Sequence, residues 1–548
     1  MSYDVIIVGA GSAGCVLATR LTENPDCRVL LVEAGSHYPS AVALPHELAR
    51  ANSVAAWVPG HPNNWPFVGT LVPGRSLPTV RGKAVGGSSA INGTYFIRGR
   101  RIDYNGWAAA GNDEWSYDKV LPYFCRSETD LDFEAPYHGN GGPIPLRRPT
   151  REQLTPISTA FTHACREAGF ADHADKNAPD GDGVGPIPRN CDNGLRLNAA
   201  LTHLSTALGR ANLTLMPNTL VRRVVFESGR AVGVEVETAE CQAVPRGTQV
   251  VLCAGGIKSP HLLMLSGIGD ARQLKTHGIT VLEDNPNVGR HLADHPTVPL
   301  HFQIDSDGTD VPADFMAIQV CLNYTAPGSS FDSDLQISCV GATLRSMLGV
   351  STGMAAELNL RGRLDRAVAT AKALRGVSKS ALLRQVMRRD DLMLNCFLTR
   401  EHSKGEMRLQ SGDPTELPAI NYNYLSQGDD LARARQVVRT GAALLRGEPF
   451  RALNAETTLL QERDLDSDAA LDRWILAHMG SALHTCCTAR MGPDSDPDAV
   501  VDQYGRVRGV KGLRVLDLSI CPELVSRGPS ATAIMIGERG AELIRRAG

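Results

Sequence analysis

The chain has 548 residues, of which 43% are hydrophobic and 21% are charged, with a formal net charge of −3. This length is too great for one ordinary hydrophobic core and suggests about three or four domain-sized units. The near-neutral charge gives no electrostatic reason to expect nucleic acid or acidic lipid as a partner. The 13 cysteines are scattered, which excludes a densely spaced disulfide scaffold.

The amino-terminal sequence enters an apolar strand without a basic leader, and no run of about eighteen apolar residues occurs. We therefore expect a cytoplasmic protein without a membrane span. An arginine-rich, helix-like stretch from Leu358 to Asp391 lacks aromatic residues. Its positive charges are expected to form a solvated face rather than a nucleic-acid groove.

The sequence YDVIIVGAGSAGCVLATRL predicts a buried strand, a glycine-rich turn and a helix. Gly9, Gly11 and Gly14 fit the pattern GxGxxG, in which the first two glycines let the backbone approach a pyrophosphate and the third lets helix and strand pack closely. The helix, from about Ala13 to Leu21, would direct its positive amino end to the phosphates.

A second predicted strand, CRVLLVEAG, ends in Glu33, about twenty residues after Gly14. A carboxylate at this place can accept hydrogen bonds from the ribose hydroxyls of an adenine dinucleotide. The same charge would repel a 2′-phosphate, which argues against NADP. The pattern does not distinguish NAD from FAD.

A second glycine cluster, RGKAVGGSSAINGTYFIRGR, spans residues 81–100. Its small residues expose many backbone amides, which suits a segment that lies against a planar ring and a phosphate. Apolar and aromatic neighbours favour a packed loop over a flexible one. An NAD site does not need such an element, whereas a larger, permanently held cofactor such as FAD does.

This cluster resembles the first signature of the glucose–methanol–choline (GMC) family of FAD-dependent oxidoreductases. The sequence GGIKSPHLLMLSGIG at residues 255–269 resembles the second signature, except that Gly256 replaces a slightly larger residue. Residues 285–296 and the carboxy-terminal tail resemble the family too. The resemblance runs along the whole chain and is weakest from about residue 300 to 390.

The resemblance implies a mixed α/β fold with a Rossmann-like domain and a second, discontinuous domain. The FAD-binding domain would comprise residues 1–150, 190–300 and 478–548. The substrate-binding domain would comprise residues 151–189 and 301–477 and form an antiparallel sheet backed by helices over the flavin. The protein would be a monomer or a homodimer.

The resemblance also assigns residues to FAD. Those expected to hold its ADP part are Gly9, Gly11, Gly14 and Glu33, with the backbone of Val221 facing the adenine. Those expected along the pyrophosphate, ribityl and isoalloxazine parts are Gly86, Ser88, Asn92 and Asp517. Relatives that attach the flavin covalently do so through a histidine at the position of Ile91, so we expect non-covalent FAD here.

Near the carboxy terminus, SALHTCCTARMG places His484, Cys486 and Cys487 close together. The family has its catalytic base eight residues before the glycine of an RMG sequence, and His484 stands eight before Gly492. Histidine, with an ordinary pKa of about 6.5, can take the hydroxyl proton of an alcohol near neutrality. A metal site would need another ligand and a geometry that adjacent cysteines rarely provide. We expect no metal, no vicinal disulfide, and two cysteines that pack near the flavin.

Two positions depart from the family pattern around this histidine. The family commonly has glycine where Cys487 stands, and His or Asn where Ser530 stands. A serine hydroxyl is shorter than Asn and cannot act as a base at neutral pH. Either Ser530 or a water orients the substrate, or His484 acts with less help, or alcohol oxidation is lost.

The sequence therefore predicts oxidation of a primary or secondary alcohol to an aldehyde or ketone, with His484 as base, Ser530 opposite it, and hydride transfer to flavin N5. A redox-neutral lyase like the hydroxynitrile lyases and a non-catalytic flavin protein are the alternatives. The electron acceptor (oxygen, a quinone or a redox carrier) stays open, as does the alcohol. No clear aromatic and acidic cage for choline is visible, and sugar-like alcohols of secondary metabolites such as aminoglycosides are suggested only by analogy.

Overall fold

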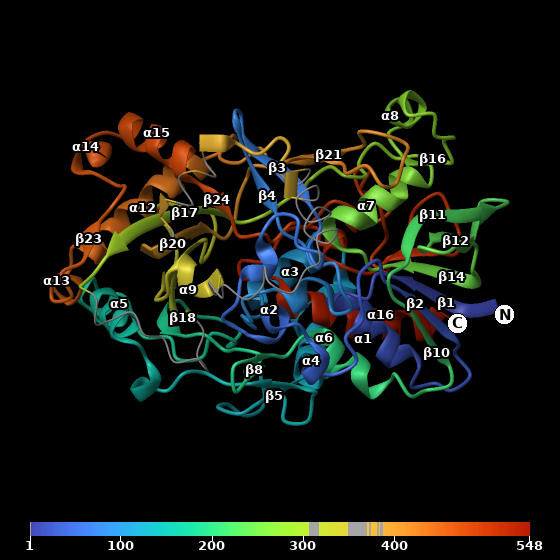
Figure 1. The fold of residues 1–548 in the computed structure, drawn as a ribbon, viewed down its shortest axis with the longest axis horizontal. Helices are drawn as coiled ribbons and strands as arrows, with labels where there is room; N and C mark the ends of the chain where they lie inside the picture. Colours follow the sequence, from blue (N-terminus) through green and yellow to red (C-terminus); the bar gives the residue numbers. More distant parts are fainter. Residues whose placement is uncertain are drawn as a thin grey trace, which may run out of the picture.

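The computed structural model describes residues 2–305, 317–348, 370–371, 374–380, 383, 387–388 and 390–547. The molecule is elongated, with one sheet near each end of its long axis and both chain termini at the same end (Figure 1). Most of the arginine-rich stretch from Leu358 to Asp391 lies outside the described residues. In the part of the chain that is described, no helix is long and apolar enough to cross a membrane.

The sheet beside the termini has eight strands, and its central strands are parallel. Its main path runs in the order β10 (Leu213–Met216), β2 (Val29–Val32), β1 (Ser2–Val8), β14 (Arg246–Leu252), β12 (Arg230–Glu237), β11 (Leu220–Glu227), with β25 (Leu513–Val515) beside β14. β2 and the carboxyl-terminal parts of β1 and β14 are buried runs of Val, Ile and Leu, as central parallel strands require. The predicted Rossmann-like architecture is confirmed.

Two helices that are remote in sequence pack together against this sheet. α1 (Ser12–Leu21) lies beside α16 (Ser530–Ala547), so close that a Cβ on Gly537 would lie 2.6 Å from the Ala13 carbonyl oxygen. Arg20 donates to the buried carboxylate of Glu538 at 2.8 Å. This packing brings the amino end of α16, with Ser530, toward the glycine-rich turn before α1.

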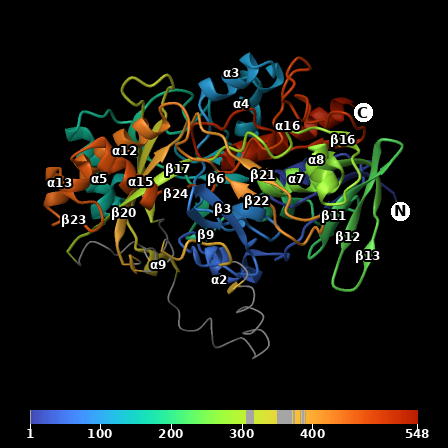
Figure 2. The same ribbon diagram turned by 90° about the horizontal axis from the view of Figure 1, so that it is seen from above.

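The sheet at the opposite end is antiparallel and has seven strands. Its main path runs in the order β23 (Glu456–Thr457), β17 (Pro296–Gln303), β20 (Leu392–Leu398), β19 (Leu335–Val340), β18 (Ile318–Tyr324), β7 (Gly183–Pro186). The helix α12 (Asp430–Leu445) packs against three of these strands, and α5 (Pro156–Glu167) against β18, β19 and β7. Seen from above, α5 and α12 lie together at this end of the molecule (Figure 2).

The short strand β24 (Gly480–Ser481) pairs with the start of β17, so that Ser481 lies opposite Pro296. This pairing carries the segment with His484 from the antiparallel sheet toward the parallel one. Apart from β7, the first strand of the antiparallel sheet is β17, which starts at Pro296, slightly before the predicted boundary at residue 301. The division of the chain into an FAD-binding and a substrate-binding domain stays a prediction.

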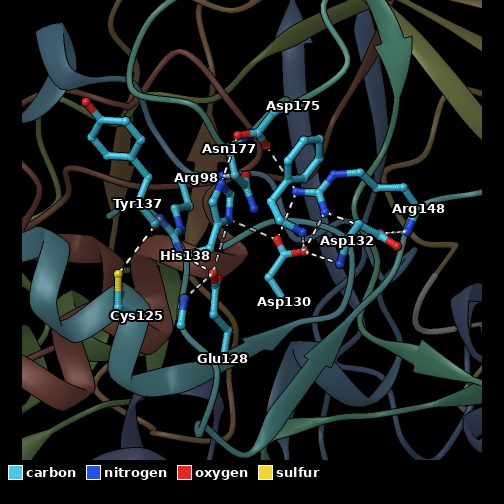
Figure 3. A network of polar contacts seen from close by, with 12 residues as sticks. Arg98, Cys125, Glu128, Asp130, Asp132, Tyr137, His138, Arg148, Asp175 and Asn177 are labelled. Carbon is cyan, nitrogen blue, oxygen red and sulfur yellow. Dashed lines mark hydrogen bonds and ion pairs between the residues drawn. The ribbon is translucent and has the colours of Figure 1, made fainter. Parts of the chain in front are cut away.

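A buried network of charges joins β5 (Glu128–Asp130) to the loops around it (Figure 3). His138 lies between Asp130, 3.0 Å from Nδ1, and Asp175, 2.8 Å from Nε2. Glu128 pairs with Arg98, and Asp130 accepts from Arg148 at 2.8 Å. Although Glu128, Asp130 and His138 are close enough to share a metal ion, arginines already neutralise both carboxylates, so we interpret the cluster as an ion network.

The network makes stability depend on pH. Burial alone would lower the pKa of His138, but the carboxylates of Asp130 and Asp175 raise it to about 10. Because the folded pKa exceeds the unfolded value of about 6.5, the stabilisation is complete below pH 6.5 and disappears as pH rises toward 10. Replacing His138 with Asn should therefore cost about 1.5–3 kcal/mol at pH 6. Equal unfolding midpoints of variant and wild type at pH 6, or a deficit that grows toward pH 10, would contradict this.

Candidate active site

The two glycine-rich segments meet at the carboxyl ends of the parallel strands. The Gly86 amide donates to the Ala10 carbonyl oxygen at 2.7 Å. A Cβ on Gly87 would lie only 2.6 Å from the Cα of Gly11. The structure thus joins two sequence clusters about seventy residues apart into one surface of bare backbone, as a shared cofactor requires.

Gly9, in the turn before α1, and Gly14, in its first turn, leave no room for a side chain. Gly9 has φ of +100°, and a Cβ there would lie 2.6 Å from the Cys253 carbonyl oxygen. A Cβ on Gly14 would lie 1.9 Å from the Gly9 carbonyl oxygen. α1 begins directly after this turn. Residues 9–14, together with Gly86 and Gly87, are here called the glycine cradle, which combines close backbone approach with the positive end of a helix. Both properties fit the pyrophosphate of FAD.

Glu33 lies at the edge of this cradle and is buried. Its two carboxylate oxygens accept from the amides of Ala10, at 3.0 Å, and Gly35, at 2.8 Å. Burial raises the pKa of Glu33 to about 7, although these amides and Lys83 oppose the shift. The Thr219 amide donates to the Glu33 carbonyl oxygen at 2.8 Å, which places the start of β11, with Val221, at the same end of the site. Glu33 and Val221 are thus brought together where the adenosine half was predicted.

Asp517 lies just after β25, and both of its carboxylate oxygens accept hydrogen bonds from the protein. One carboxylate oxygen accepts from the Gly255 amide at 2.8 Å and the Ser259 hydroxyl at 2.5 Å. The other accepts from the amide and hydroxyl of Ser519, at 2.8 and 2.6 Å. The carboxylate thus fixes the start of α7 (Gly255–Leu265). Its predicted place near the pyrophosphate and ribityl chain stays a prediction.

Asn92 and Ser530 are brought together, whereas the hydroxyl of Ser88 contacts another part of its own loop. The Asn92 side-chain amide donates to the Ser530 hydroxyl at 3.4 Å. Ser88 is exposed, and its hydroxyl accepts from the Gly82 amide at 3.2 Å. Ser530 opens α16, so the positive end of that helix lies beside both polar groups.

His484 stands on the loop after β24, half-buried, with its ring fixed on one side. Its Nδ1 lies 2.9 Å from Nδ1 of His295, and the two ring planes are nearly perpendicular at 89°. Its Nε2 lies 3.8 Å from the place that a Cβ on Gly528 would occupy. Because Gly528 precedes Ser530 by two residues, the free side of the imidazole faces the loop that carries the predicted partner.

The surroundings keep this imidazole uncharged. Burial, and secondarily the charge of Arg81, lower the pKa of His484 to about 3. Arg81 is close by because its guanidinium donates to the hydroxyl of the next residue, Thr485. At neutral pH the side chain is therefore a base with a free lone pair, which is the state needed to accept a proton.

Asp294 holds the His484 loop in place, although no motif predicts a role for it. One carboxylate oxygen accepts from the amides of His295, at 2.8 Å, and His484, at 2.6 Å. The other accepts from the hydroxyls of Tyr424, at 2.8 Å, and Ser481, at 2.5 Å. The carboxylate is fully buried. The only signal in the sequence is an adjacent acid and histidine within a stretch that resembles the family.

The two cysteines beside His484 are buried thiols. Cys486 donates to the His484 carbonyl oxygen at 2.8 Å, and burial raises the pKa of both thiols well above the ordinary range. Cys487 has φ of +69°, a left-handed conformation that favours glycine, which explains the family's usual residue. Gly256 is also explained, because a Cβ there would lie 2.3 Å from the Thr485 carbonyl oxygen.

Comparisons with known proteins show what this chain is similar to. A family model described as GMC oxidoreductase matches residues 3–297, and a second with the same description matches residues 401–537. An oxygen-dependent choline dehydrogenase of Brucella anthropi is 34% identical over 558 residues, covering 99% of this chain and 96% of that protein.

Two solved structures extend the comparison to the fold. The pyridoxine 4-oxidase from Mesorbium loti has a TM-score of 0.83 at 28% identity and covers 100% of this chain and 99% of its own. A variant of the Aspergillus oryzae formate oxidase, studied for modification of its FAD, has a TM-score of 0.83 at 25% identity and covers 100% and 98%.

Proposed function

The chain belongs to the GMC oxidoreductase family, and we propose that it oxidises a primary or secondary alcohol to an aldehyde or ketone with FAD. The observation that carries the proposal is the neutral imidazole of His484, whose Nε2 faces the Gly528–Ser530 loop. That loop leads into α16, whose amino end packs toward the glycine cradle. A base therefore lies at one end of the proposed dinucleotide site.

The residues of the cradle would hold the FAD, with Glu33 at the ribose and the bare backbone of Gly9, Gly11 and Gly87 at the pyrophosphate. When bound, FAD supplies at N5 the acceptor for the hydride of the carbinol carbon. His484 takes the hydroxyl proton at Nε2, which leaves negative charge on the substrate oxygen. The hydroxyl of Ser530 and the positive end of α16 are placed to stabilise that charge.

The test is to mix the holoenzyme with candidate alcohols under nitrogen and follow the flavin colour. Choline and pyridoxine, named for relatives of this chain, and polyhydroxylated alcohols form the first panel. Bleaching by at least one alcohol is expected. Repeating the assay in air with peroxide detection tests oxygen as the acceptor, which the names of both relatives favour. A panel that leaves the flavin oxidised throughout argues against alcohol oxidation.

A lyase on the same scaffold is the second candidate, because Ser530 replaces the usual His or Asn. It would retain FAD and His484 but cleave its substrate without net redox change. Product formation with unbleached flavin under nitrogen would identify it.

We propose that the FAD is dissociable. Ile91 is buried where covalent attachment would need a histidine, and an aliphatic side chain cannot form that bond. After acid precipitation, the yellow colour is expected in the supernatant. Colour that stays in the protein pellet would show attachment by another residue.

Ser530 is proposed to orient the substrate oxygen with one hydrogen bond. Replacing Ser530 with Ala removes this donor and the acceptor for Asn92, so kcat/KM should fall about tenfold, as expected for about 1.4 kcal/mol. Ser530→Asn keeps a polar group and should retain more activity than the Ala variant. Unchanged turnover in both variants, at equal FAD content, would show that the position is unimportant.

A further inference from the structure

A second histidine, His295, lies directly behind the proposed base. It is almost fully buried, at 1% exposure, just before β17 begins. Its Nδ1 is 2.9 Å from Nδ1 of His484, and its Nε2 is 3.0 Å from the carbonyl oxygen of Val525. The three groups form a chain from the loop that precedes Ser530 to the ring of His484.

The carbonyl oxygen of Val525 determines which nitrogen is the donor in each of these two hydrogen bonds. A carbonyl oxygen only accepts, so the hydrogen between His295 and Val525 must be on Nε2 of His295. A neutral imidazole carries one N–H, so Nδ1 of His295 is left as an acceptor. The hydrogen between the two rings must then be on Nδ1 of His484. The lone pair of His484 consequently lies on Nε2, the nitrogen that faces Gly528.

Both rings are neutral in this environment. Burial is the main cause that lowers the pKa of His295 to about 3, with His484 as the second cause. The nearest carboxylate, Asp294, is engaged with the amides of both residues and two hydroxyls. The carboxylates of Asp103 and Glu401 and the guanidinium of Arg81 also act on the pair. Arg400, Lys404 and Glu523 line the same pocket as His295.

We propose that His295 is a positioning residue that fixes His484 in its Nδ1–H tautomer and so keeps the basic nitrogen directed at the substrate. The perpendicular rings support this, because an in-plane N–H of one ring can meet the in-plane lone pair of the other without stacking. The same chain ties the Val525–Ser530 loop to the base. The use of the tautomer in catalysis rests on the proposed function, but the tautomer itself exists without turnover.

The direct test is a histidine-selective ¹⁵N NMR spectrum of the wild-type holoenzyme. The expected pattern for His484 is a protonated Nδ1 and an unprotonated Nε2, with the opposite pattern for His295. The variants His484→Gln and His295→Asn identify the two sets of signals by their loss. The opposite tautomer at His484, or a charged ring near neutral pH, overturns the proposal. This readout does not depend on finding a substrate, so a failure of the proposed function would be seen separately.

Two variants extend the test to catalysis. His295→Leu removes the acceptor and should slow flavin reduction by about 10- to 100-fold, as loss of a group that orients a functional histidine commonly does. His295→Asn retains an oxygen at the position of Nδ1 and should recover most of that loss. His163→Leu, the same change at an exposed histidine of α5, is the control and should react like the wild type.

Two kinetic outcomes would overturn the proposal, namely a wild-type rate for His295→Leu or an equal loss in the Asn and Leu variants. FAD content and unfolding midpoint are measured for each variant, because a purely structural role would lower these together with the rate. If His295→Leu does not fold, the spectrum of the wild type still decides.

Discussion

Replacing His484 with glutamine is expected to lower kcat/KM for the alcohol substrate by about 10²- to 10⁴-fold. Glutamine has similar length and can still make hydrogen bonds, but it has no lone pair basic enough to take a hydroxyl proton. The loss should appear in the rate of flavin reduction under nitrogen rather than in the affinity for FAD, because the cradle is built from other segments.

The control for this variant is His163→Gln, the same change at an exposed position. Its flavin should be reduced at the wild-type rate. If His484→Gln also reduced its flavin within about threefold of the wild type, another group would have to be the base.

The pH dependence of the rate of flavin reduction in the wild type also tests the role of His484. Since burial and Arg81 lower the pKa of His484 to about 3, the base is already free at pH 5. As pH falls, the rate of flavin reduction should therefore not drop around pH 6.5, the ordinary pKa of histidine being about 6.5.

Replacing Asp294 with Ala is expected to be the most destabilising single change near the site, at about 3 kcal/mol or more. The change leaves the buried donors of His295 and Tyr424 and the half-buried donors of His484 and Ser481 without an acceptor. Hydrogen bonds to a charged group are worth about 1.5–3 kcal/mol each. It also releases the amide of His484, so the rate of flavin reduction should fall as well. Denaturant unfolding of the holoenzyme, followed by circular dichroism and flavin fluorescence, measures the first effect.

Asp294→Asn is the matched variant, because its amide oxygen can still accept two of the four hydrogen bonds. The stability of this variant should therefore lie between those of the wild type and Asp294→Ala. Asp26→Ala, at an exposed aspartate, controls for loss of one negative charge. Equal stability of Asp294→Ala and Asp26→Ala would show that the Asp294 contacts do not hold this loop.

The parts of the fold that local pattern specifies could be predicted from the sequence. Val5 to Val8, the three glycines and α1 follow one another within twenty residues, and so do the two strands of the hairpin formed by β11 and β12. Each of these elements is predicted from neighbouring residues in the sequence. Apolar runs indicate buried strands, glycines indicate tight turns, and a helix amino terminus indicates a place for phosphate. His484 was found by its place in a motif rather than by its surroundings.

The supporting residues could not be predicted in this way. His295 meets His484 across 189 positions of sequence, and Asp294 meets it across 190. Nothing local indicates such contacts, because the pairing of β24 with β17 creates them. The departures from the family pattern also became interpretable only in three dimensions. The left-handed backbone at Cys487 and the close approach of Gly256 to Thr485 both lie next to the base in the chain.

Alcohol oxidation at this site requires a hydride and a proton to leave the same alcohol. The most direct measurement titrates the holoenzyme with its best alcohol under nitrogen and compares flavin bleached with carbonyl product formed. We expect loss of the yellow colour with one aldehyde or ketone formed per FAD. Carbonyl product that accumulates while the flavin stays oxidised would rule out alcohol oxidation and identify a lyase.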